Sequence, residues 1–131
     1  MAEDGAPAGL DPTAAGRLRR LGGDDLVRRM GEMFLALGEE RLAAARSGLA
    51  GGDLDALERA AHSLKSSAGN LGATALADRA SRLEQPAGAA RAARLEETTA
   101  AAGALPDLLA AMEEAFERAA ADIRRLLEAI E

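Results

Sequence analysis

The only histidine in the chain, His62, is followed by a lysine and a run of small residues whose types and spacing could support chemistry at an exposed imidazole. A neutral imidazole is a nucleophile at neutral pH, because its ordinary pKa of about 6.5 leaves one ring nitrogen with a free lone pair. Lys65 stands three residues later, where on a helix its ammonium can reach a phosphate on the imidazole. This pair of residues predicts that His62 can form a covalent bond to a phosphoryl group whose negative charge Lys65 offsets.

The small residues after Lys65 strengthen this interpretation, whereas a lone histidine on a helix is usually a surface residue without a function. The run Ser66–Gly69 is not one that a helix would choose for stability, since an internal glycine costs about 1 kcal/mol relative to alanine. Gly69 lies seven residues after His62, almost directly below it on a helix. A bulky side chain at that position would block a partner that approaches the imidazole.

The helix around His62 is expected to present the imidazole to solvent. Its apolar residues recur at alternating steps of three and four: Leu54, Leu57, Ala61, Leu64, Ala68 and Leu71. At about 100° per residue, His62 falls about 130° from the centre of this stripe. The outward side around the histidine then holds small and polar residues: Asp55, Glu58, Lys65, Ser66 and Gly69.

Turn and capping residues divide the rest of the chain into further helices. We expect a disordered tail over 1–10, a short helix over 11–21 that Gly22 and Gly23 end, and longer helices over 24–47, 54–70, 73–85 and 105–130. Pro86 and Gly88 should stop the helix over 73–85, and 87–104 should form a connection with some helical content. The fold class is therefore all-α, an antiparallel up-down four-helix bundle with a short additional N-terminal helix, in one domain over 11–131.

The long helix over 24–47 has two possible uses for its outer apolar residues. Met30, Met33 and Leu37 share the spacing of its core stripe, and we interpret them mainly as core residues. If the edge of that stripe is uncovered, these three side chains could instead form an apolar surface on which a partner docks.

Composition narrows the class of protein. Alanine dominates the 131 residues and two phenylalanines are the only aromatics, so closely packed helices are favoured over sheets. The chain has no cysteine, which excludes disulfides and thiolate metal sites. A net charge of −6 argues against general binding to nucleic acid or to anionic membranes. With no apolar run of the ~18 residues needed to span a membrane and no signal-like N-terminus, a cytoplasmic protein is expected.

The string from His62 to Gly72, HSLKSSAGNLG, resembles the phosphoacceptor signature of histidine-containing phosphotransfer domains, H-x-L-K-[GS]-[SA]-[SA]-x-[NS]-L-G. The resemblance is strongest over 53–84 and weakest over 87–104. It implies that His62 accepts a phosphoryl group from an aspartyl phosphate of a receiver domain and returns it to another response regulator. It further implies that Lys65 stabilises the phosphate, and that the partner surface includes Glu58, Ser66, Gly69 and Asn70.

The same resemblance implies the partners and cofactors. Receiver domains of response regulators and a hybrid histidine kinase would be the partners of a monomeric chain, and the receiver would supply the Mg²⁺, so the chain itself needs no cofactor or metal. The chain lacks a nucleotide-binding glycine motif, so it is not expected to be a kinase that uses ATP. Two alternatives stay open: a helical adaptor that binds a receiver or kinase without using His62, and a dimer formed through the helix over 106–130.

Overall fold

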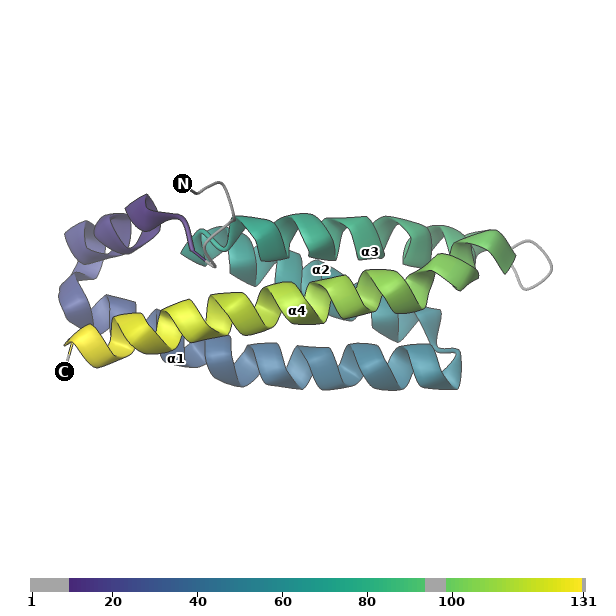
Figure 1. The fold of residues 1–131 in the computed structure, drawn as a ribbon, viewed down its shortest axis with the longest axis horizontal. Coiled ribbons are helices and arrows are strands. Elements are labelled where there is room, and N and C mark those ends of the chain that lie inside the picture. The colour runs from purple at the N-terminus through teal and green to yellow at the C-terminus, as the bar shows by residue number, and fades with distance from the viewer. Residues whose placement is uncertain (1–9, 94–98, 131) are drawn as a thin grey trace.

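The computed structural model describes residues 10–93 and 99–130, and all regular elements among them are α-helices. These are α1 (Pro12–Gly51), α2 (Leu54–Leu71), α3 (Thr74–Ala93) and α4 (Thr99–Ile130). The helices form a ring in which α1 packs against α2 and α4, and α3 packs against the same two helices (Figure 1). Two-residue turns join α1 to α2 and α2 to α3, so these consecutive helices run antiparallel. The predicted all-α bundle is confirmed.

The short N-terminal helix expected over 11–21 is not confirmed as a separate element. It forms the first part of α1, which bends where Gly22 and Gly23 leave helical geometry. Gly23 has a φ of 70°, a left-handed conformation that favours glycine. The Asp24 carboxylate, which follows the bend, pairs with Arg19 on the other side of it at 3.0 Å. In Figure 1 the first part of α1 lies across the end of the bundle.

Backbone hydrogen bonds fasten this first part of α1 to the rest of the molecule. The Asp11 N–H donates to the carbonyl of Gly72 in the α2–α3 turn at 2.6 Å, and the Leu10 N–H donates to Asp122 Oδ2 at 3.1 Å. The Asp11 side chain accepts from the Thr13 N–H and caps the helix. Of the predicted tail over 1–10, residues 1–9 lie outside the described residues, whereas Leu10 packs against the core.

The helix predicted to end at Gln85 continues through Pro86 to Ala93. The reason is that the buried stripe of α3 does not stop at Leu83: Ala87 and Ala90 continue it and are almost fully buried. Burial of a continuing apolar face outweighs the loss of one backbone hydrogen bond at proline.

The last helix begins earlier than predicted, at Thr99 instead of Leu105, so Pro106 lies inside α4 and not at its first turn. Alanines dominate residues 99–104 and favour helix, so the connection expected over 87–104 is helical at both ends. The part of it over 94–98 lies outside the described residues.

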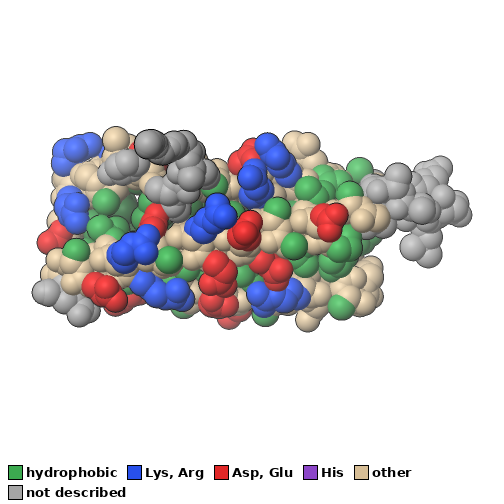
Figure 2. All heavy atoms as spheres, viewed as in Figure 1, with side chains coloured by type: hydrophobic (Ala, Val, Ile, Leu, Met, Phe, Trp, Pro, Cys, Tyr) green, Lys and Arg blue, Asp and Glu red, His purple; other side chains and the backbone are tan. Residues whose placement is uncertain are grey.

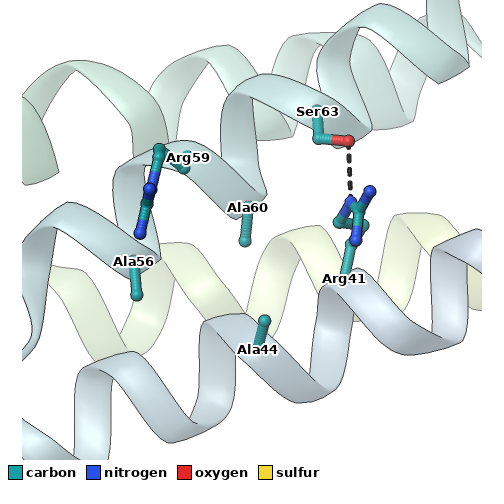
Figure 3. Close-up of a pocket in the computed structure, with 6 residues that line it drawn as sticks. All are labelled: Arg41, Ala44, Ala56, Arg59, Ala60 and Ser63. Atoms are coloured by element: carbon teal, nitrogen blue, oxygen red, sulfur yellow. Dashed lines mark hydrogen bonds between the residues drawn. The ribbon is translucent and has the colours of Figure 1, made fainter.

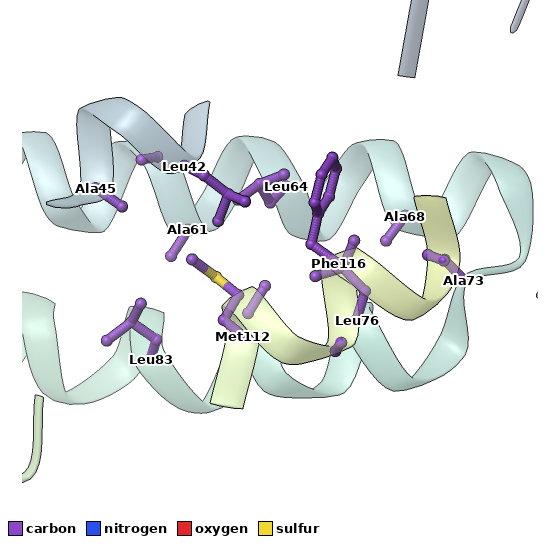
Figure 4. Packing of buried hydrophobic residues seen from close by; sticks show 14 of the residues in the cluster. Leu42, Ala45, Ala61, Leu64, Ala68, Ala73, Leu76, Leu83, Met112 and Phe116 are labelled. Carbon is purple, nitrogen blue, oxygen red and sulfur yellow. The ribbon is translucent and has the colours of Figure 1, made fainter. Parts of the chain in front are cut away.

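The core of the bundle consists mainly of leucines and alanines, together with Met112, Ile123 and two phenylalanines, and Figure 4 shows Phe116 and Met112 among them. The rings of Phe34 on α1 and Phe116 on α4 lie 5.4 Å apart between centroids. Gly38 allows this arrangement, because a Cβ at that position would overlap the Phe116 ring. The close α1–α4 contact therefore requires glycine, and it fixes the rotation of α1 against the bundle.

Candidate functional site

The ends and the buried face of α2 determine where His62 points. Asp53 caps the helix by accepting the Ala56 N–H at 3.1 Å, and Gly72 ends it with a φ of 72°. The predicted stripe is buried, apart from the partly buried Leu54 at its start. With these constraints the His62 side chain lies on the outer side of α2 and is 61% exposed, as predicted.

Glu84 on α3 joins the two residues that the sequence singled out. Its Oε2 lies 2.7 Å from His62 Nδ1, and its Oε1 lies 2.7 Å from Lys65 Nζ. One carboxylate from the neighbouring helix thus holds both side chains, and only 19% of it is exposed. Histidine, lysine and glutamate form a compact site across the α2–α3 contact.

The charge of Glu84 decides which imidazole nitrogen is available for chemistry. The hydrogen bond from Lys65 lowers the pKa of Glu84 below its ordinary value, and the one with His62 acts in the same direction, while burial opposes both. The carboxylate is therefore ionised at neutral pH and can only accept hydrogen bonds. Neutral His62 then donates its Nδ1–H to Glu84, which leaves the lone pair on Nε2. The geometry prepares Nε2 as a nucleophile.

The other residues predicted for the site lie around His62 in different ways. Ser66 and Gly69 are exposed on the same outer side, and a Cβ built at Gly69 would meet no atom within 4 Å, so the surface below the imidazole is open. Asn70 is also exposed, but it lies on the side of α2 that faces α1. Glu58 points toward α3, where its carboxylate occupies the space left by Gly88.

An apolar pocket lies beside the site, between α1 and the end of α2. Its lining residues come from both helices: Met30, Met33, Phe34, Leu37, Ser67, Asn70 and Leu71. Met33 is 55% exposed and Leu37 is 38% exposed, so the prediction that they are core residues was wrong. Phe34, the residue after Met33, is buried instead, and Met33 and Leu37 lie at the edge of the bundle.

Sequence reasoning missed Glu84 as a member of the site. The signal available was its place directly after Leu83 in the buried stripe of α3, which puts it at the edge of that helix. Which of the neighbouring helices that edge faces depends on the packing of α3, and periodicity does not provide this. The sequence shows all three residues, but it does not show that Glu84 contacts His62 and Lys65.

A helical bundle that displays one imidazole, oriented by a carboxylate and flanked by an ammonium, defines a protein that can carry a group on histidine. The chain belongs to the Hpt domain family, whose model matches residues 29–131. Hpt domains are phosphocarriers of two-component phosphorelays, work with receiver domains and histidine kinases, and are not kinases themselves. Histidine phosphotransfer is thus the function that the family gives to this chain.

A solved structure agrees with the family over almost the whole chain. The chain is similar to histidine-containing phosphotransfer protein B from Pseudomonas aeruginosa PAO1, with 25% sequence identity and a TM-score of 0.79. The alignment covers 95% of this chain and 98% of that protein. It therefore includes most of the N-terminal stretch that the family model does not match. No curated protein sequence matches the chain.

None of the helices within 10–93 and 99–130 is both long and apolar enough to cross a membrane. Over the same ranges, no three side chains of the His, Cys, Asp or Glu type gather in a way that could hold a metal ion.

Proposed function

We propose that His62 is the phosphoacceptor, and that the chain takes a phosphoryl group from an aspartyl phosphate of one receiver domain and passes it to the aspartate of another response regulator. The observation that carries the proposal is the 2.7 Å contact between His62 Nδ1 and the ionised Glu84. It directs the lone pair to Nε2, on a side chain that solvent and a partner can reach.

The transfer requires little from this chain beyond position and charge. The Nε2 lone pair forms the N–P bond while the bond from phosphorus to the aspartate oxygen breaks, and the aspartate leaves as a carboxylate. The proton on Nδ1 stays in the hydrogen bond to Glu84. The imidazole becomes cationic when Nε2 is phosphorylated, and the carboxylate beside it offsets that charge. Return of the group to a second aspartate is the reverse of these steps.

Lys65 supports the proposal as a cation that shares Glu84 with the imidazole. Its ammonium is held by Glu84 within the same site, and 37% of the side chain is exposed, so it can turn toward a phosphoryl group on Nε2. Ser66 and the open surface at Gly69 leave room for the receiver, which would bring the aspartate and its Mg²⁺. No residue of this chain is assigned to hold a cofactor.

The apolar pocket of Met30, Met33 and Leu37 supports a docking role for the α1–α2 face. Exposed apolar side chains beside a reactive group are typical of a surface that binds a partner briefly. We place a receiver domain there, with a hybrid histidine kinase as the upstream source of phosphate, and expect a cytoplasmic monomer.

The test is phosphate uptake from a panel of isolated receiver domains, each phosphorylated on its aspartate. Wild-type chain should acquire label that survives alkali and is lost in acid, as a phosphohistidine does. His62→Ala and His62→Gln should acquire none and keep their helical content, because the side chain is exposed. Uptake by the alanine variant would refute the assignment. A wild-type chain that takes up nothing from any receiver would favour an adaptor that binds without chemistry.

A further inference from the structure

A second hollow lies between α1 and α2, on the opposite side of His62 from Glu84. It has a volume of ≈ 300 Å³ and is lined by Arg41, Ala44, Ala56, Arg59, Ala60 and Ser63. Figure 3 shows Ala44 and Ala60 between the two arginines, which stand at different ends of the hollow, and Ala56 next to Arg59. Small side chains from both helices thus leave a space with a guanidinium on each side.

Both arginines are held where they are by exposed partners that a new ligand could replace. Arg41 Nε donates to Ser63 Oγ at 3.0 Å, and its Nη1 pairs with Glu40 at 3.2 Å. Arg59 pairs with Asp55, one turn earlier on α2, at 3.3 Å. Ion pairs of this kind contribute little, because water screens them. The Ser63 contact nevertheless turns the Arg41 fork toward the hollow, so less ordering is needed when a carboxylate binds.

This arginine pocket and the apolar pocket follow each other along the contact between α1 and α2, and we call this line of contact the groove. On α1, Arg41 follows Leu37 by one turn, and on α2, Ser67 follows Ser63 by one turn. The midpoints of the two pockets are nine to ten residues apart on each helix, which corresponds to about 14 Å. His62 directly precedes Ser63 on α2 and lies between the two midpoints along that helix, although it lines neither pocket.

We propose that the arginine pocket receives an acidic side chain of the docking receiver domain, about 14 Å from the apolar residue that enters the Met33–Leu37 end. The partner is then a helix whose apolar anchor and carboxylate lie on the same face, two to three turns apart, so that both reach the groove. Because one end of the groove is apolar and the other is basic, the partner helix can bind in only one orientation, the one that brings the receiver's aspartate to His62. Arg41 and Arg59 are specificity-determining residues, and this role rests on the phosphotransfer function proposed above.

The test uses the full chain with Arg41→Gln and Arg59→Gln together, and a receiver domain selected because it phosphorylates the wild type. The second-order rate of transfer should fall about tenfold, and its dependence on salt should become weaker, because charges at an interface act mainly on association. Uptake from phosphoramidate, a small donor that needs no docking, should stay at the wild-type rate. A loss with both donors would overturn the proposal, since it would place the effect on His62 itself.

Arg118→Gln is the matched control. Arg118 on α4 is exposed and pairs with Glu114 one turn away, as Arg59 pairs with Asp55, and its loss removes one positive charge, as the loss of Arg59 alone does. The face over α4 interleaves basic and acidic side chains and shows no histidine atom (Figure 2). Arg118→Gln should transfer like wild type. A twofold or smaller effect of the paired pocket substitutions, or an equal loss in the control, would overturn the proposal.

A second copy of this chain is the competing occupant of the groove. Sedimentation at several concentrations should show the same monomer for the wild type and the paired variant. A wild-type dimer that the two substitutions dissociate would assign the pocket to self-association and overturn the receiver proposal. Failure of the proposed function is distinct from both outcomes, because then no receiver would phosphorylate even the wild type.

Discussion

Replacement of Glu84 tests whether its contact with His62 prepares the nucleophile. Glu84→Ala removes both hydrogen bonds made by the carboxylate. Glu84→Gln removes the negative charge but keeps a carbonyl oxygen that can accept the Nδ1–H. The two substitutions therefore separate the orientation of the imidazole from the charge beside it.

The size of the effect follows from the exposure of the two partners. A hydrogen bond to a charged group contributes about 1.5–3 kcal/mol, but His62 is 61% exposed, so we expect a value below this range, on the order of 1 kcal/mol. That energy corresponds to about a fivefold change in the ratio of the two neutral tautomers. Glu84→Ala should shift the ratio away from the form with a free Nε2 and slow uptake from phosphoramidate by about the same factor, about fivefold.

The assay combines imidazole ¹⁵N shifts, which report the tautomer ratio, with the rate of uptake from phosphoramidate. Glu84→Gln should resemble the wild type in tautomer ratio, and Glu114→Ala, which removes an exposed carboxylate from α4, should leave both readouts unchanged. If Glu84→Ala keeps the wild-type tautomer ratio and uptake rate, the carboxylate does not orient the imidazole and the reasoning fails.

The lowered pKa of Glu84 adds a pH dependence with a definite sign. The folded carboxyl gives up its proton at lower pH than in the unfolded chain, where its pKa is about 4.5, so the unfolded state binds more protons in the acidic range. The stability that Glu84 contributes is therefore complete above that value and is lost as pH falls through the folded pKa. Urea unfolding should show wild type more stable than Glu84→Gln at about pH 7, and the difference should vanish at low pH, where protonated Glu84 resembles glutamine. A difference that grows on acidification would contradict this sign.

The remaining predictions concern Lys65 and two glycines. Lys65→Ala should slow transfer from a receiver without abolishing it and should raise the pKa of Glu84, measurable by ¹³C titration of the carboxyl; an unchanged rate would remove the proposed electrostatic role. Gly69→Ala should stabilise the fold by up to about 1 kcal/mol in urea unfolding, because the site is open, whereas Gly69→Leu should lower the rate of transfer from a receiver but not from phosphoramidate. Gly38→Ala should destabilise the fold by about 1–3 kcal/mol, because the new methyl overlaps buried Phe116, while Gly51→Ala, with open space around it, should have little effect.

The elements that the sequence predicted correctly are those with a strong local signal. The helix around His62 has a cap at each end and a regular apolar stripe, and α2 was predicted to within one residue. Pro86 and Pro106 misled the prediction because both lie inside helices, where alanine-rich stretches and burial of the next turn favour continuation. Whether proline ends a helix depends on what the following turn packs against, and a single helix does not contain that information.

The same limit applies to the site. Exposure of His62 and the nearness of Lys65 follow from the geometry of one helix, so they were predictable. Glu84 belongs to another helix, and its contact depends on how α2 and α3 rotate against each other. The exposure of Met33 and Leu37 depends likewise on Gly38, which sets how closely α1 approaches α4.

The two sides of α2 have different roles: the side that faces α3 controls the reactivity of His62, and the side that faces α1 offers a surface for the partner. On the α3 side, Glu84 fixes the imidazole and holds a cation, through contacts made within the chain. On the α1 side lies the groove, which has exposed apolar residues at one end and two arginines at the other. The ion pairs that these arginines make with Glu40 and Asp55 are exposed to water. A substitution on the α3 side should therefore change uptake from every donor, large or small. One on the α1 side should change only which receiver domains can reach the same histidine, so partner choice can vary in this fold without altering its chemistry.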